Sequence, residues 1–113
     1  MAELGPESGT ETMIDTRADA DGAPVIAVAG ELDISNADAL DAAVAAAVAA
    51  AVAGGPARLT FDLANLRFMD SAGIAVLIRA AETVDEVHLL APGPSVRRVI
   101  EITGLTQLFT IEP

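Results

Sequence analysis

The chain has 113 residues, a formal net charge of −11, no cysteine and one histidine. This length fits one domain, and the missing cysteines and single histidine exclude disulfides, thiolate metal sites and multi-histidine metal centres. The acidic balance argues against nucleic acid or an anionic membrane surface as a partner and favours a protein with a basic patch. No motif indicates a cofactor.

The N-terminal segment is acidic and lacks the basic and then apolar regions of a secretion signal. We expect residues 1–10 to be a disordered leader and residues 11–113 to form the folded domain. The longest apolar run, 42–53, is shorter than the roughly 20 residues that span a bilayer. We therefore expect a cytoplasmic protein without membrane insertion.

Two short strands are predicted first, over 13–18 and 25–29, joined in a hairpin by Asp19-Ala20-Asp21-Gly22. Residues 30–35 are expected to form a loop. Either Ser35 or Asn36 then caps the first helix.

This helix is predicted to run to about Ala53 and to end at Gly54-Gly55-Pro56. Its apolar residues recur every four positions and form one stripe. They are Leu40, Val44, Val48 and Val52.

A strand over 58–63 is predicted next, because apolar and polar residues alternate there. Its polar face indicates a sheet that is well covered on one side only. The remaining predicted elements are a helix over 74–83, a strand over 86–91, a helix capped by Ser95 that runs to Ile102 and ends at Gly104, and a strand over 108–111. The order favours an α/β fold: a mostly parallel or mixed sheet of about five strands, with helices mainly on one face.

The segment Asp70-Ser71-Ala72-Gly73 carries the strongest functional signal. A serine hydroxyl between a strand and a helix lies at the positive end of the helix, where free N–H groups can meet phosphate oxygens. The carboxyl ends of neighbouring parallel strands share one edge of a sheet. One loop carries Glu31 and Asp33 and the next carries Asn65, Asp70 and Ser71, and these are the candidate docking residues. If the two strands are neighbours, we expect Asp33, Asp70 and Ser71 to share one surface.

Other interpretations of this segment stay open. Asp-Ser before an apolar helix is also typical of a plain N-cap. Ser71-Ala72-Gly73 matches the second half of a G-x-S-x-G nucleophile elbow, but Met69 stands in place of the first glycine. The one histidine, His88, is predicted mid-strand, facing solvent or a helix edge. These features argue against a hydrolase, and the chain is not predicted to be an enzyme.

Two further charged groups carry weaker signals. Asp33 and Asp70 could bind a divalent cation, but two carboxylates without further ligands are too few to predict a metal site. Arg97-Arg98 is interpreted as a solvated helix face rather than an anion site.

Three segments resemble the STAS domain of bacterial anti-anti-sigma factors, also called anti-sigma factor antagonists. Gly30-Glu31-Leu32-Asp33 resembles the start of that domain, and Phe68-Met69-Asp70-Ser71-Ala72-Gly73-Ile74 resembles its phosphorylation segment. The stretch from Pro94 to Ile100, with Thr103-Gly104-Leu105, resembles its third helix and the helix end. The resemblance runs from about residue 12 to 111.

The resemblance implies a phosphoprotein that works by partner switching in transcription regulation. The unphosphorylated form would bind an anti-sigma factor that is also a serine kinase of the GHKL type, and so free a sigma factor. Phosphorylation of Ser71 would break the complex, and a PP2C-type phosphatase would restore it. Asp33 and Asp70 would shape the docking surface, and Gly73 would allow close backbone approach near the phosphate.

Two departures from the family pattern are visible. Ala72 stands where many members have Ser or Thr, which leaves Ser71 as the acceptor in the motif. The chain stops at Pro113, so we expect the C-terminal helix common in the family to be missing. An alternative within the family is an accessory subunit of a lipid-transport ABC complex that works without phosphorylation.

Overall fold

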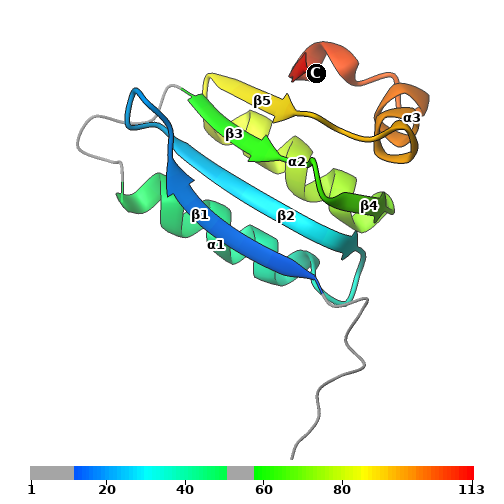
Figure 1. The fold of residues 1–113 in the computed structure, drawn as a ribbon, viewed down its shortest axis with the longest axis horizontal. Helices are drawn as coiled ribbons and strands as arrows, with labels where there is room; N and C mark the ends of the chain where they lie inside the picture. The colour runs from blue at the N-terminus through cyan, green and yellow to red at the C-terminus, as the bar shows by residue number, and fades with distance from the viewer. Residues whose placement is uncertain (1–11, 51–57) are drawn as a thin grey trace, which may run out of the picture.

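Six strands form one mixed sheet, and helices α1 and α2 pack against one of its faces (Figure 1). The structure, a computed structural model, describes residues 12–50 and 58–113. The expected leader, Val52, the helix end near Ala53 and the Gly54-Gly55-Pro56 stop lie outside these residues. The elements in chain order are β1 (Met13–Ala18), β2 (Pro24–Leu32), α1 (Ala37–Ala50), β3 (Arg58–Asp62), β4 (Leu66–Met69), α2 (Ser71–Thr83), β5 (Glu86–Leu90), α3 (Pro94–Ile102), the 3₁₀ helix η3 (Thr106–Leu108) and β6 (Thr110–Glu112).

The predicted hairpin of β1 and β2 is confirmed, with the two strands antiparallel. The turn is stabilised by Asp19, whose Oδ1 accepts hydrogen bonds from the backbone N–H groups of Asp21 and Ala23 at 2.8 and 3.0 Å. Gly22 has a φ of +85°, a conformation that a residue without Cβ adopts readily. The remaining strand pairs are all parallel, in the order β1-β2-β3-β5-β6 with β4 also on β2.

Strand β2 has two parallel partners along one edge. It pairs with β3 over Val25–Ala27 and with β4 over Gly30–Leu32. The prediction of a loop from residue 30 is therefore wrong for residues 30–32, and β4 was not predicted. The register shifts between Gly30 and Glu31, where Gly30 has a φ of +93°. This irregularity, which glycine permits, turns the end of β2 from β3 to β4.

The alternation predicted for β3 is confirmed, because Leu59, Phe61 and Leu63 are fully buried on the helix side. Leu40 and Val44 of the predicted α1 stripe are buried, and Val48 packs partly buried against the core. No described helix covers the opposite face of the sheet (Figure 1). Ion pairs there join Arg58 to Asp19 and Asp21, and Arg17 to Asp62.

The C-terminal part differs from expectation in its details. Helix α3 begins after Gly93 with Pro94, which fits a first helical turn because its fixed φ suits the helix and the N–H that proline lacks has no acceptor within the helix there. Ser95 therefore lies inside the helix, and its predicted capping role is wrong. Gly104 ends the helix with a φ of +74°, as predicted. The expected last strand is confirmed as β6, although it begins at Thr110 rather than at Leu108, where η3 ends. Helix α3 packs against β4.

Candidate functional site

The carboxyl ends of β2 and β4 lie side by side. Leu32 and Met69 are register partners, and the backbone N–H of Asp70 donates to the carbonyl oxygen of Leu32 at 3.1 Å. The residues that directly follow each strand, Asp33 and Asp70, therefore lie at one edge of the sheet together with Ser71. The structure therefore brings these three residues together at one edge, as the sequence led us to expect.

Helix α2 begins at Ser71, three residues earlier than predicted, because Asp70 caps it. Oδ1 of Asp70 accepts hydrogen bonds from the N–H groups of Ala72 and Gly73 at 2.8 and 3.4 Å. Ser71 is the first helical residue and is exposed to solvent. The expectation that the first helix N–H groups are free for a phosphate is wrong for Ala72 and Gly73, since the Asp70 carboxylate already occupies both.

The turn between β2 and α1 is held by its own hydrogen bonds. The carbonyl of Asp33 accepts from the N–H groups of Asn36 and Ala37 at 3.1 and 2.9 Å. Oδ1 of Asn36 accepts from the Asp33 N–H at 2.9 Å, and Asn36 Nδ2 donates to the Glu31 carbonyl at 2.9 Å. The Ser35 side chain donates to Asp33 Oδ1. Ser35 and Asn36 thus bond within the turn, so the predicted side-chain cap on α1 is wrong.

Asp33 keeps its carboxylate oriented and charged in this turn. Its Oδ1 accepts from the hydroxyl and from the backbone N–H of Ser35. These hydrogen bonds favour the ionised form and lower the pKa of the Asp33 carboxyl. A negative charge is therefore fixed beside the end of β4 at neutral pH.

Gly73 has a packing role in the structure. A Cβ at this buried position would lie 2.6 Å from Cγ of Met69 and 2.8 Å from Cδ2 of Leu32. Its missing side chain therefore lets α2 approach the ends of β2 and β4. The neighbours that it accommodates are core side chains, so this packing role does not depend on a phosphate.

The two other predicted docking residues lie differently. Asn65 precedes β4 and Asp70 follows it, so the prediction that they share a loop is wrong. The Asn65 carbonyl accepts instead from the Gly30 N–H, at 3.0 Å. Glu31 is the register partner of Phe68, and its carboxylate lies 4.0 Å from the guanidinium of Arg67.

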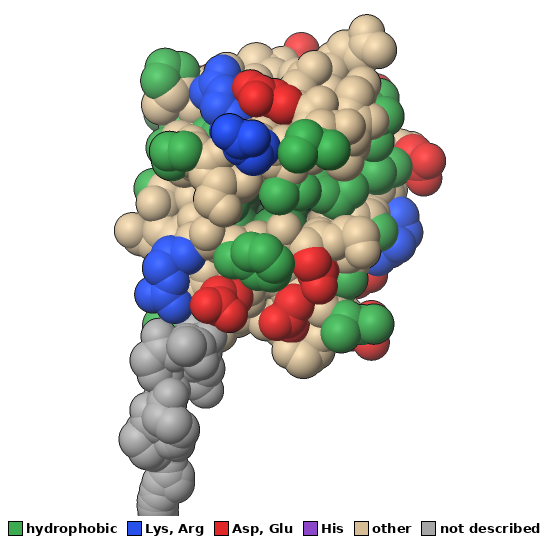
Figure 2. Space-filling view, turned by 90° about the vertical axis from the view of Figure 1, so that its right-hand side faces the viewer, with side chains coloured by type: hydrophobic (Ala, Val, Ile, Leu, Met, Phe, Trp, Pro, Cys, Tyr) green, Lys and Arg blue, Asp and Glu red, His purple; other side chains and the backbone are tan. Residues whose placement is uncertain are grey.

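Two apolar residues at this edge were not identified from the sequence. Ile34, in the turn after β2, is 82% exposed, and Phe68, in β4, is 45% exposed. Figure 2 views this end of the molecule and shows hydrophobic side chains beside acidic ones on its surface. The available sequence signal was an isoleucine between Asp33 and Ser35, in a stretch that no periodicity assigns to a core.

His88 has carboxylate partners. Nδ1 of His88 bonds to the Glu112 carboxylate and Nε2 lies 3.2 Å from Oε1 of Glu86. The bond to Glu112 is the largest effect and raises the pKa of His88; burial opposes it, and the weaker bond to Glu86 raises the pKa further. His88 lies in β5 on the sheet face that carries Arg58 and Thr60, opposite the buried Val87 and Leu89, as expected for a strand residue on the uncovered face. The imidazole is nevertheless only 17% exposed, because carboxylates of β5 and β6 bond to it.

The remaining charged groups offer no second site in the described part of the chain. No group of three or more His, Cys, Asp or Glu is placed to hold a metal ion among the described residues. Arg97 pairs with Glu101 one turn on at 3.4 Å, and Arg98 is exposed, as expected for a solvated helix face.

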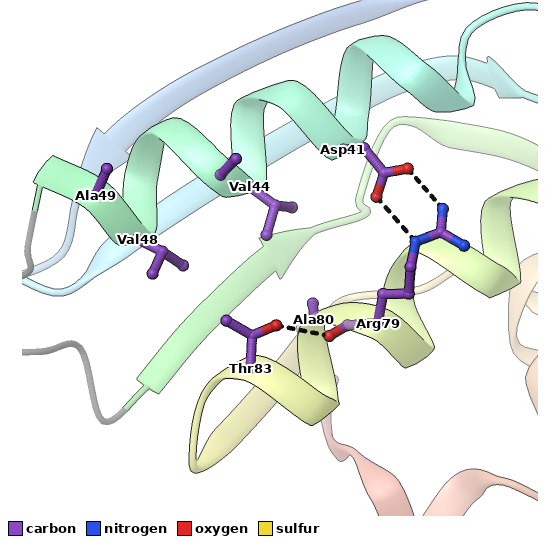
Figure 3. A pocket seen from close by; sticks show the side chains of 8 residues that line it. Asp41, Val44, Val48, Ala49, Arg79, Ala80 and Thr83 are labelled. Carbon is purple, nitrogen blue, oxygen red and sulfur yellow. Dashed lines mark hydrogen bonds and ion pairs between the residues drawn. The ribbon is translucent and has the colours of Figure 1, made fainter.

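A hollow of about 440 Å³ lies between α1 and α2 (Figure 3). At one end Arg79 bonds to both carboxylate oxygens of Asp41, at 3.3 and 2.5 Å. The hollow includes none of the residues around Ser71. Its lining residues are Asp41, Val44, Ala45, Val48, Ala49, Arg79, Ala80 and Thr83.

None of the described helices is long and apolar enough to cross a membrane.

Comparisons with known proteins agree with this geometry. The sequence model of the STAS domain family matches residues 16–113 of this chain. The anti-sigma-F factor antagonist RsfB of Mycobacterium tuberculosis is 30% identical over 107 residues, which cover 92% of this chain and 84% of RsfB.

Two solved structures share the fold. An anti-sigma factor antagonist from Mycobacterium paratuberculosis is 32% identical with a TM-score of 0.81, over 94% of this chain and 89% of that one. The phosphorylated form of the Bacillus cell fate determinant SpoIIAA is 22% identical with a TM-score of 0.66, over 88% and 90% of the two chains.

Proposed function

The chain belongs to the STAS domain family, and from this membership we propose that it is an anti-sigma factor antagonist switched off by phosphorylation of Ser71. The unphosphorylated protein binds an anti-sigma factor that is also a serine kinase of the GHKL type, and this binding frees a sigma factor. Phosphorylation of Ser71 dissociates the complex, and a PP2C-type phosphatase restores the active form. RsfB, the relative in Mycobacterium tuberculosis, is named for antagonism of an anti-sigma factor.

The observation that carries the proposal is the position of Ser71. Its side chain is exposed at the first residue of α2, directly after the Asp70 cap and beside the end of β2 with Asp33. A kinase can reach such a hydroxyl without opening the core. The phosphorylated form of SpoIIAA, a protein of the same fold, is consistent with this chemistry.

The electrostatics explain how one phosphate can dissociate a complex. A phosphoserine carries about −1.5 to −2 charges at neutral pH. It would join Asp33 and Asp70, while the Ala72 and Gly73 N–H groups already bond to Asp70. The new charge therefore lacks these two helix donors as partners. Each ~1.4 kcal/mol of lost contact or repulsion at the docking surface lowers affinity about tenfold.

The test is phosphorylation of the purified chain by candidate anti-sigma factor kinases and ATP, followed by intact-mass spectrometry. We expect one phosphate per chain, and none on Ser71→Ala. Ser95→Ala is the matched control, because Ser95 is exposed on α3 and has no part in the turn around Asp33, and this variant should accept one phosphate. Full phosphorylation of Ser71→Ala would contradict the proposal.

Binding supplies a second readout for the same proposal. Ser71→Asp is expected to bind the anti-sigma factor more weakly than the unphosphorylated wild type does, and Ser95→Asp should bind it as tightly as the wild type. The relatives described above are named antagonists, which favours this function over an accessory subunit of a lipid-transport complex. Capture of ABC transporter subunits in place of a kinase would favour that alternative.

A further inference from the structure

We propose that Ile34 and Phe68 are the apolar anchors of the docking surface around Ser71. The inference rests on the proposed function and specifies the partner's chemistry: an apolar recess bordered by Lys and Arg side chains. The acceptor surface is defined here as Glu31, Asp33, Ile34, Phe68, Asp70 and Ser71.

Ile34 is presented to solvent by a turn that needs nothing from its side chain. Ile34 is 82% exposed, and the turn is closed by backbone hydrogen bonds from the N–H groups of Asn36 and Ala37 to the Asp33 carbonyl. The Asn36 side chain adds two bonds, from the Asp33 N–H and to the Glu31 carbonyl. Since the backbone is already fixed, little conformational entropy is lost when a partner covers Ile34, so the apolar contact contributes nearly its full free energy to binding.

Phe68 is fixed by the strand that carries it. Leu66 and Met69, on either side of it in β4, are buried at 3% and 1% exposure, while Phe68 remains 45% exposed. Its register partner is Glu31 on β2. Aromatic residues are enriched at protein interfaces, where a rigid ring gives a large contact area. An exposed phenylalanine within three residues of a phosphate acceptor is well placed for this role.

The charges around these two side chains define the partner. Glu31, Asp33 and Asp70 all lie at the ends of β2 and β4, and the Ser35 hydrogen bonds keep Asp33 ionised. Arg67 is 4.0 Å from Glu31 and offsets part of this charge. Apolar side chains with an acidic border complement an apolar recess with a basic border, the usual division of an interface into core and rim.

Phosphorylation and anchoring then act on the same surface by different means. Ile34 and Phe68 contribute buried apolar area, which mainly sets how long the complex lasts. The carboxylates and the Ser71 phosphate set the sign of the local potential, which steers association and changes with salt. This division predicts different kinetic signatures for the two sets of residues.

The experiment measures association and dissociation rates between the unphosphorylated full chain and the kinase that phosphorylates Ser71. Ile34→Ala and Phe68→Ala are each expected to weaken binding about tenfold or more, mainly through faster dissociation. Asp33→Asn is expected to slow association and to reduce its dependence on salt. Ile102→Ala and Leu108→Ala are matched controls, since these apolar residues are 75% and 43% exposed outside the acceptor surface. Both controls should keep wild-type affinity.

The outcomes separate the inference from the proposed function. If both Ile34→Ala and Phe68→Ala bind the kinase with wild-type affinity and dissociation rate, the two residues are not anchors. The proposed function would still stand. A wild-type chain that is neither bound nor phosphorylated by any anti-sigma factor kinase would overturn the proposed function itself. Unchanged urea midpoints for Ile34→Ala show that the fold is intact, which its exposure predicts. A second variant, Ile34→Lys, should weaken binding further by placing a cation against a basic rim.

Discussion

The backbone N–H of Asp70 donates a hydrogen bond to the carbonyl oxygen of Leu32. This bond joins the end of β4 to the end of β2, so Asp33 and Asp70 are placed beside Ser71 by the main chain. The candidate site is therefore built before any partner binds. Its side chains can be changed one at a time to separate stability from recognition.

Removal of the α2 cap should destabilise the fold. Asp70→Ala leaves the N–H groups of Ala72 and Gly73 without their carboxylate acceptor. We expect the free energy of unfolding to fall by about 0.5–2 kcal/mol, as measured by urea denaturation. Asp85→Ala removes the same charge from an exposed turn and should change stability by less than about 0.5 kcal/mol. Equal losses in both variants would contradict the capping role.

Gly73→Ala should be destabilising although alanine favours helices. Its Cβ would meet Met69 and Leu32, which are 1% and 0% exposed and have little room to move. Overpacking costs about 1–3 kcal/mol and helix propensity returns up to about 1, so a net loss of about 1–2 kcal/mol is expected in urea denaturation. Gly93→Ala is the control, because nothing lies within 4 Å of its Cβ position. A Gly73→Ala protein as stable as the wild type would show that α2 can move away.

Phosphate and Asp70 should compete for the same helix donors. In the wild type, phosphorylation of Ser71 is expected to change stability little, since Asp70 holds two N–H groups. In Asp70→Ala these donors are free, and the phosphate should stabilise α2 by about 0.3–1 kcal/mol. Chemically installed phosphoserine avoids any dependence on kinase recognition, and thermal unfolding with and without the phosphate gives the comparison. A phosphate effect equal in both backgrounds would argue against competition.

Stability should fall as pH rises through the pKa of His88. The folded-state pKa of His88 is raised, first by the bond to Glu112 and then by that to Glu86. The stabilisation is thus complete below the unfolded pKa of about 6.5 and is lost as pH increases through the raised folded value. Urea denaturation across this window should show the decline in the wild type. His88→Gln should flatten it, and an unchanged slope in that variant would refute the assignment.

Much of the fold follows from local sequence signals, and the failures have identifiable causes. The alternation of Leu59, Phe61 and Leu63 predicted β3, and the Asp19 turn predicted the hairpin. Strand β4 has four residues with no alternating pattern, and it exists because β2 turns at Gly30 to accept a second partner. The formation of β4 therefore depends on pairing with a distant strand, which the periodicity of a short segment cannot indicate.

The candidate site divides in the same way. Chain order predicted Asp33, Asp70 and Ser71 at one edge from the strands over 25–29 and 58–63, whereas the structure brings them together through β2 and the unpredicted β4. Which side chain occupies the first N–H groups of α2 depends on the rotamer of Asp70 and was not predictable from spacing. The exposure of Ile34 likewise depends on how its turn closes.

The turn that carries Ile34 is closed without any contact from the Ile34 side chain, so this residue can change without loss of the turn. Exchange of that one side chain changes the exposed surface of the turn, while the hydrogen bonds that close it and the buried core stay as they are. If the proposed docking role of Ile34 holds, paralogous antagonists within one cell could differ at this position and so bind different anti-sigma factors.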